Sequence, residues 1–175
     1  ALAAQLPQRP SPRALAHVQQ AFLGSSPVTD ALVSQVQALF PNAAIRNSYG
    51  TTEAGPIVFR DHPDGLPRPP TSVGYPVADI GWRFTNGSEV EGPLELHTPA
   101  VSPGYLNRPE ANEKAFADGW YRTGDIMRRD ENGFFYFVGR EDDMFVCGGE
   151  NIYPGQVEAL LEKHPAVSQA AVIPM

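Results

Sequence analysis

Cysteine and long apolar runs are scarce in this sequence of 175 residues. Its single cysteine, Cys147, cannot form a disulfide within the chain. No apolar run approaches the roughly 20 residues that a helix needs to cross a bilayer, and the first residues lack the charged-then-apolar pattern of a secretion signal. We therefore expect a soluble, cytoplasmic protein without a membrane span.

Basic residues are also few, and they are dispersed. Lysine and arginine sum to 13 against 20 acidic residues, which gives a net charge of −7. The clustered pair Arg128-Arg129 makes no basic stripe, so the sequence lacks the basic pattern that is typical of nucleic-acid-binding proteins. The four histidines are scattered without the spacing of metal ligands, which argues against a histidine metal site.

Proline and glycine, by contrast, are abundant, with 18 and 16 residues. Apolar runs lie between these breakers, and hydrophobic residues make up 42% of the chain, which predicts a packed core with many turns. The length suits one ordinary domain, or one domain and part of another.

Helical and extended patterns alternate along the chain. Helices are predicted from apolar spacing and from Pro109, over residues 28–40, 107–116 and 154–164. Thr29 is a suitable N-cap for the first helix. Strands are predicted at residues 43–45, within 73–98, and at 126–129, 134–138, 145–147 and 170–173, with hairpin turns at Asn86-Gly87 and Asn132-Gly133. Residues 61–70 are expected to form a loop.

The first segment suited to chemistry spans residues 47–53. The ring of Tyr49 can stack on a base, and the hydroxyl of Thr52 can donate to a phosphate oxygen. Glu53 can hold Mg²⁺, a cation that prefers oxygen ligands. A strand end followed by a polar turn fits the same residues equally well.

Two further segments carry polar groups after tight turns. Asp125 follows a glycine, and its carboxylate can accept from both hydroxyls of a ribose, although an ordinary turn aspartate is the simpler interpretation. Between residues 139 and 158, Arg140 offers a rigid fork of donors and Gly148-Gly149 permits close backbone approach. The alternative for this segment is a charged hairpin exit followed by a capped helix.

Together, the order and spacing of these segments resemble the acyl-adenylate-forming superfamily. That superfamily contains acyl- and aryl-CoA ligases, luciferases and the adenylation domains of peptide synthetases. The resemblance begins near Phe22 and continues to the last residue. The matching stretches are Tyr49-Gly50-Thr51-Thr52-Glu53, Gly104-Tyr105, Tyr121-Arg122-Thr123-Gly124-Asp125, and Gly139-Arg140 through Pro154.

The resemblance implies roles for individual residues. Thr52 contacts the α-phosphate and Glu53 contributes to a Mg²⁺ site, so these two are the expected catalytic residues. Tyr49 packs on adenine, and Asp125 and Arg140 reach the ribose. The expected nucleotide-binding set is Ser25, Ser26, Tyr49, Gly50, Thr51, Thr52, Asp125 and Arg140.

The resemblance also implies two half-reactions and two domains. A small carboxylic acid and ATP give acyl-AMP and pyrophosphate, and the thiol of CoA then displaces AMP. The implied fold is α/β: residues 1–141 form the C-terminal part of a large AMP-binding domain, with an α/β segment and a β-barrel-like segment. Residues 142–175 begin a small α+β domain. Asp142 is the expected hinge, and Gly148 with Gly149 is the expected loop on the CoA side.

Two features of the superfamily have no counterpart in this sequence. Nothing in residues 1–46 resembles its phosphate loop, and neither Lys114 nor Lys163 is placed like its catalytic lysine. We therefore expect a fragment of an ATP-dependent acyl- or aryl-CoA ligase. Two alternatives stay open: a truncated, non-catalytic member that binds a nucleotide or a partner, and an adenylation domain that loads a carrier protein.

Overall fold

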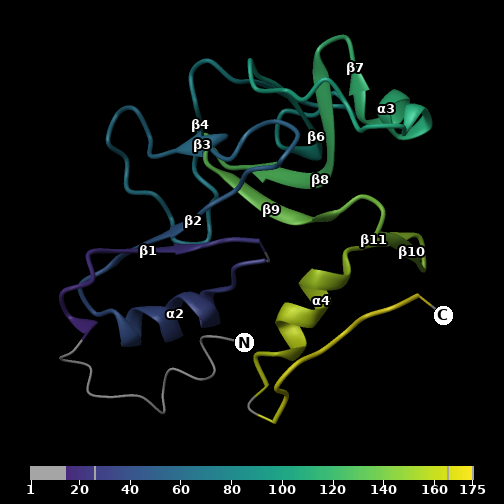
Figure 1. Cartoon of the computed structure of the whole chain (residues 1–175). Helices are drawn as coiled ribbons and strands as arrows, with labels where there is room; N and C mark the ends of the chain where they lie inside the picture. Colours follow the sequence, from purple (N-terminus) through teal and green to yellow (C-terminus); the bar gives the residue numbers. More distant parts are fainter. Residues whose placement is uncertain (1–14, 26, 165, 175) are drawn as a thin grey trace.

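The computed structural model describes residues 15–25, 27–164 and 166–174. The first unit is a parallel strand pair with a helix between its strands: β1 (Gln20–Leu23), α2 (Asp30–Leu39) and β2 (Ala44–Asn47). Parallel neighbours need such a crossover, because a tight turn cannot return the chain in the same direction. Figure 1 shows α2 lying beneath β1 and β2.

Helix α2 begins and ends close to the predicted positions. The Thr29 Oγ1 atom accepts a hydrogen bond from the Leu32 amide at 3.2 Å, which satisfies one free donor of the first turn. Val36 is the buried residue of the helix, and the chain leaves the helix at Phe40, directly before Pro41. The prediction of a capped, amphipathic helix over this region is confirmed.

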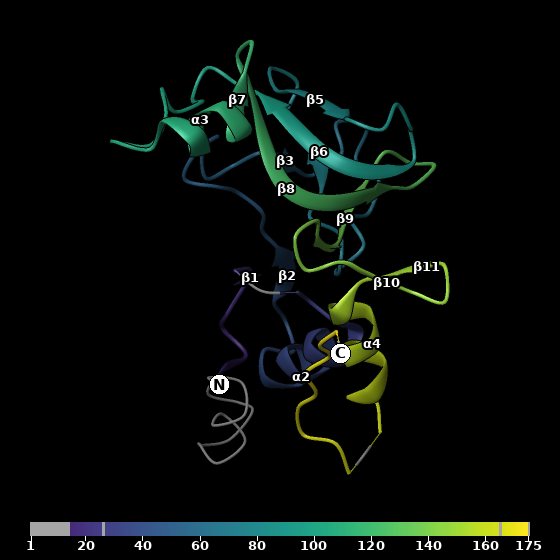
Figure 2. The same cartoon turned by 90° about the vertical axis from the view of Figure 1, so that its right-hand side faces the viewer.

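An antiparallel sheet of five strands occupies the upper half of the view in Figure 2. We call it the central sheet because its strands come from the middle of the chain, residues 81–140. Its order is β5-β6-β8-β7, and β9 also pairs with β8. The strands are β5 (Gly81–Phe84), β6 (Glu91–His97), β7 (Phe116–Ala117), β8 (Trp120–Arg129) and β9 (Phe135–Arg140). Both predicted hairpin turns are present, and Gly87 and Gly133 have φ values of +74° and +81°. The sheet is thus the predicted β-rich segment.

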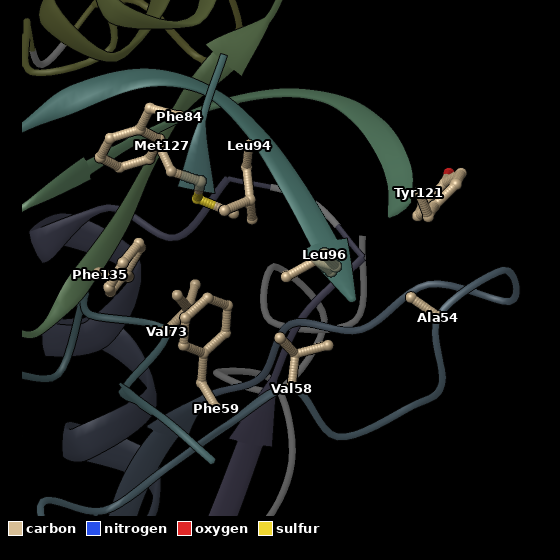
Figure 3. Packing of buried hydrophobic residues seen from close by; sticks show 10 residues of the cluster. All are labelled: Ala54, Val58, Phe59, Val73, Phe84, Leu94, Leu96, Tyr121, Met127 and Phe135. Atoms are coloured by element: carbon tan, nitrogen blue, oxygen red, sulfur yellow. The ribbon is translucent and has the colours of Figure 1, made fainter. Parts of the chain in front are cut away.

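One face of this sheet packs on the short pair β3 (Phe59–Arg60) and β4 (Tyr75–Pro76) and on the chain around them. Figure 3 shows the contact from close by, with Phe135 between Phe59 and Phe84. The fully buried members, at most 2% exposed, include Val58, Val73, Leu94, Leu96, Met127 and Phe135. This cluster is the hydrophobic core.

The opposite face of β6 carries a buried charge. Glu95 lies between Leu94 and Leu96, so the alternation of a strand turns its side chain away from the hydrophobic core. Its carboxylate, in a residue only 2% exposed, accepts from Arg83 at 2.6 Å and from Arg122 at 2.8 Å. Two cations on neighbouring strands therefore compensate one buried anion.

The remaining elements follow the sheet: α3 (Pro109–Ala115) precedes β7, and β10 (Phe145–Cys147), β11 (Glu150–Ile152) and α4 (Pro154–Leu161) follow β9. Residues 170–173 were expected to form a strand, and this prediction is wrong. The amides of Ala170 and Val172 donate to the carboxylates of Glu162 and Glu158 instead of to a neighbouring strand. Among the described residues, no helix is long and apolar enough to cross a membrane.

Candidate nucleotide site

A cleft of about 1110 Å³ lies among the N-terminal unit, the edge of the central sheet and α4. Several chain segments that are distant in the sequence line it, and they include most of the predicted site residues. The lining comprises Gly24, Ser25, Pro27, Val28, residues 47–52, Gly55, Pro56, Val73, Asp125, Phe137, Gly139, Arg140, Asp142, Asp143, Pro154, Gly155, Glu158 and residues 172–174.

Asp125 and Arg140 meet because their strands are paired. The antiparallel register of β8 and β9 sets Asp125 directly opposite Arg140. An Nη1 hydrogen of Arg140 is donated to Asp125 Oδ1 at 3.0 Å, and the same nitrogen donates to the Thr123 carbonyl at 3.2 Å. The hairpin that the sequence predicts is therefore what assembles this ion pair.

Tyr49 completes the cluster from the other side of the cleft. Its phenol donates to Asp125 Oδ2 at 2.5 Å, so each carboxylate oxygen of Asp125 has its own donor. Asp125 is 6% exposed, and burial raises the pKa of its carboxyl, while the bonds from Tyr49 and Arg140 act in the opposite direction. Burial is the main cause that raises the pKa of Tyr49, and the negative charge of Asp125 raises it further. The phenol therefore stays protonated.

The turn after Tyr49 is built by close backbone contact. A Cβ atom on Gly50 would lie 2.4 Å from the Pro56 carbonyl oxygen, so only glycine fits there. Thr51 uses its hydroxyl to accept from the Ala54 amide at 3.0 Å, and it pairs with Gly55 through backbone hydrogen bonds. Thr52 is exposed at the cleft, where its hydroxyl is available to a bound anion.

Glu53 takes a different direction from its neighbours. It is not among the described residues that line the cleft, and its Oε1 atom accepts from the Tyr105 phenol at 2.7 Å. The segment after β6 fastens this turn further, because the Ser102 amide donates to the Glu53 carbonyl at 2.7 Å and Thr98 Oγ1 donates to the Ala54 carbonyl at 3.1 Å. The predicted metal role of Glu53 stays a prediction.

The residues around Glu53 have the donor chemistry that Mg²⁺ requires. A carboxylate with one oxygen outside the Tyr105 bond lies beside two threonine hydroxyls in the sequence, and all are hard oxygen donors. Across the described part of the chain there is no cluster of three or more His, Cys, Asp or Glu able to hold a metal. This set fits a cation held by one carboxylate together with substrate phosphates.

The other predicted residues are divided between the cleft and its surroundings. Ser25 lines the cleft with a φ of +63°, whereas Ser26 lies outside the described residues. Asp142 also lines the cleft, and its Oδ1 atom accepts from Arg140 Nε at 3.2 Å. Gly148 and Gly149, with φ of +62° and +89°, form the two-residue turn between β10 and β11 and do not belong to the described cleft lining.

Two residues that support the site were missed in the sequence. Tyr105 belongs to a stretch recognised only as a match, without a role. Arg68 was placed in a loop, yet its side chain is 8% exposed and its guanidinium donates to the carbonyls of Asn47 and Ser72. Asn47 in turn donates to the Thr71 carbonyl at 2.8 Å, so hydrogen bonds join this loop to the end of β2, two residues before Tyr49. An arginine among prolines is the one signal in the sequence that could have pointed to Arg68.

The fold and the cleft define the chain as part of a mixed α/β protein with a polar site between segments. Residues 1–106 match the AMP-binding enzyme family, and the chain belongs to that family. The resemblance inferred from its motifs is therefore confirmed.

Individual relatives agree with this assignment. The chain is 35% identical over 156 residues to a 2-succinylbenzoate–CoA ligase of Geobacillus sp. (strain WCH70), covering 86% of this chain and 31% of the relative. It is 36% identical over 156 residues to a long-chain-fatty-acid–CoA ligase of Yersinia pestis, covering 86% and 27%. The chain thus spans about a third of the length of these curated relatives.

Solved structures show the same fold. The amide bond synthetase McbA from Marinactinospora thermotolerans superposes with a TM-score of 0.77 at 28% identity, covering 99% of this chain and 37% of that one. An o-succinylbenzoate CoA synthetase from Bacillus subtilis, in complex with the acyl-adenylate intermediate OSB-AMP, superposes with a TM-score of 0.72 at 30% identity. It matches 92% of this chain and 35% of its own.

Proposed function

We propose that this chain is the nucleotide-binding segment of an ATP-dependent acid–CoA ligase. The observation that supports this most is the cleft in which Tyr49, Asp125 and Arg140 converge beside the exposed hydroxyl of Thr52. An aromatic ring, a buried carboxylate and a threonine hydroxyl suit the three parts of a nucleotide: base, ribose and phosphate.

In the first half-reaction, an oxygen of the substrate carboxylate attacks the α-phosphorus of ATP. A new oxygen–phosphorus bond forms, the bond to the β-phosphate breaks, and pyrophosphate leaves with its electron pair. No protein nucleophile is needed, so the chain contributes positioning and charge compensation. Tyr49 holds the base, Asp125 and Arg140 orient the ribose, and Thr52 donates to the α-phosphate.

Glu53 is the residue that would hold Mg²⁺ beside the phosphates. When bound, this cation neutralises the charge that develops on the pyrophosphate. The Tyr105 phenol fixes one oxygen of Glu53 and leaves the other for the cation. Gly50 and Thr51 keep the turn in shape, so that Thr52 faces the cleft.

In the second half-reaction, the sulfur of CoA attacks the acyl carbon, loses its proton, and displaces AMP. We propose that the unit from Asp142 onward rotates about that residue between the two steps, and that the Gly148-Gly149 turn approaches CoA. The phosphate loop and the catalytic lysine would come from the rest of the enzyme. We place this chemistry in the cytoplasm, where ATP and CoA are available.

Pyrophosphate exchange in the intact protein, with a panel of fatty and aromatic acids, tests the proposal. We expect acid-dependent exchange that Asp125→Ala abolishes and that the surface variant Arg128→Ala retains. Exchange at the same rate in Asp125→Ala would contradict the assignment. The absence of exchange, with retained ATP binding, would favour the non-catalytic alternative.

The acceptor of the acyl group is tested separately with preformed acyl-AMP. CoA, a carrier protein with its phosphopantetheine, and a simple amine are offered in parallel, the last because an amide bond synthetase shares this fold. We expect CoA to react fastest. Preferential loading of the carrier protein would support the adenylation-domain alternative.

A further inference from the structure

We propose that the phenol of Tyr49 is a positioning group for Asp125, in addition to the ring being a platform for the base. This inference rests on the proposed nucleotide site. It assigns the two ends of one side chain to two tasks: the ring face meets the base, and the hydroxyl holds the carboxylate that meets the ribose.

The carboxylate of Asp125 is held at both oxygens, but the two donors differ in quality. Arg140 is 44% exposed in its side chain and also donates to Asp142, so solvent and a second carboxylate compete for it. Tyr49 has Asp125 as the acceptor of its phenol, in a partly buried position. Tyr49 is therefore the donor that fixes the rotation of the carboxylate most firmly.

Two acceptor positions of Asp125 remain after these bonds. An ionised carboxylate offers about four lone-pair sites, and the two protein donors use one on each oxygen. The two vicinal hydroxyls of a ribose match the remaining pair. Since the terminal torsion of an aspartate is broad, loss of the phenol would let the carboxylate rotate away from that match.

Tyr49 is itself held by the core. Its ring packs edge-on against Phe59 with centroids 5.7 Å apart, and Phe59 packs against the fully buried Phe135 at 5.0 Å. On the backbone side, Gly50 lies tightly against Pro56. Packing against the core therefore restrains the Tyr49 ring, and the phenol of that ring in turn restrains the Asp125 carboxylate.

Tyr49→Phe is the variant that separates the two tasks, because it keeps the ring and removes the hydroxyl. Dissociation constants for ATP, 2′-deoxyATP, 3′-deoxyATP and 2′,3′-dideoxyATP are measured by calorimetry on the intact protein and on this variant. We expect ATP affinity to fall about tenfold, the size typical of a hydrogen bond to a charged group. We expect the dideoxy nucleotide, which has no ribose hydroxyls, to change by less than about twofold.

Tyr136→Phe is a matched control. The Tyr136 phenol also donates to a carboxylate, Asp130 Oδ2 at 2.8 Å, but neither residue lines the described cleft. This variant should leave all four affinities unchanged. The melting temperatures of both variants verify that each is folded at the temperature of the titrations.

Three outcomes would overturn the inference. An equal loss for all four nucleotides would mean that the phenol does not act through the ribose hydroxyls. No loss would make the hydrogen bond irrelevant, and tighter ATP binding would mean that the phenol blocks Asp125. Each of these leaves the nucleotide site in place. Failure of the proposed function looks different, because Asp125→Ala would then bind ATP as well as the unaltered protein does.

Discussion

The central sheet and the units flanking it differ sharply in how they bury apolar side chains. In the sheet, Leu96, Met127 and Phe135 are 0% exposed, and their neighbours close around them. In the flanking units, by contrast, Phe22 on β1 is 67% exposed and Leu160 on α4 is 65% exposed. The sheet buries its apolar side chains against the chain around β3 and β4, whereas β1 and α4 present apolar surface.

The candidate site lies where these two kinds of region meet. Asp125 and Arg140 belong to the sheet, while Ser25, Thr52 and α4 reach the cleft from outside it. The sheet side is therefore fixed by packing, and the other side by short turns. If this comparison is right, substitutions in the sheet should change stability far more than comparable substitutions in the flanking units.

The largest effect is expected for Glu95→Ala. Removing the buried carboxylate leaves Arg83 and Arg122 without their shared partner. Because both arginine side chains are about half exposed, water can replace part of the lost bonding, and we expect a loss of about 2 kcal/mol. Urea unfolding of the intact protein and of the variant measures this change in the free energy of unfolding. A loss below about 1 kcal/mol, the range of surface ion pairs, would show that the bonds from the two arginines to Glu95 contribute little to stability.

A smaller effect is expected in the flanking unit from Thr29→Ala. The variant removes the N-cap hydrogen bond to the Leu32 amide and should lower the free energy of unfolding by about 1 kcal/mol. Thr29→Ser keeps the cap oxygen and serves as the control. If serine and alanine lower stability equally, the cap does not stabilise α2.

A still smaller effect is expected from Phe22→Ser. The side chain is largely exposed in this chain, so within the 175-residue polypeptide the change should lie within about 0.5 kcal/mol. In the intact protein, the same substitution should cost more if the rest of the enzyme covers β1. Equal effects in both would mean that Phe22 stays exposed.

The last prediction concerns pH and the cost of keeping Asp125 charged. Burial raises its pKa above 3.8, so the folded state binds the proton more tightly than the unfolded state. Stability therefore falls as pH rises from 3.8 through the folded-state pKa. Asp125→Asn, which cannot ionise, should gain a small stability over the unaltered protein at neutral pH. This advantage should shrink as the pH is lowered toward 3.8, as followed by unfolding at a series of pH values.

The sequence was most informative where a local pattern decides the structure. Asn132-Gly133 predicted the hairpin whose register pairs Asp125 with Arg140, and Thr29 marked the start of α2. The family motifs also predicted that Tyr49, Asp125 and Arg140 belong to one site, and all three line the cleft. These predictions depend on neighbours in the sequence or on a motif shared with relatives.

Long-range partners could not be predicted in the same way. Glu95 is a charged residue in a strand, and only the pairing of β5, β6 and β8 shows that two arginines enclose it. Likewise, Tyr105 lies 52 residues from Glu53, and only the structure shows that its phenol donates to that carboxylate. Residues 170–173 have strand propensity, but a strand also needs a partner.

The central claim, that this cleft binds the nucleotide, is tested most directly by a crystal structure of the intact protein with AMP. We predict adenine on the ring of Tyr49 and both ribose hydroxyls within hydrogen-bond distance of the Asp125 carboxylate. The Tyr49 phenol should keep its bond to Asp125. AMP bound elsewhere, or bound in this cleft with its ribose away from Asp125, would contradict the account.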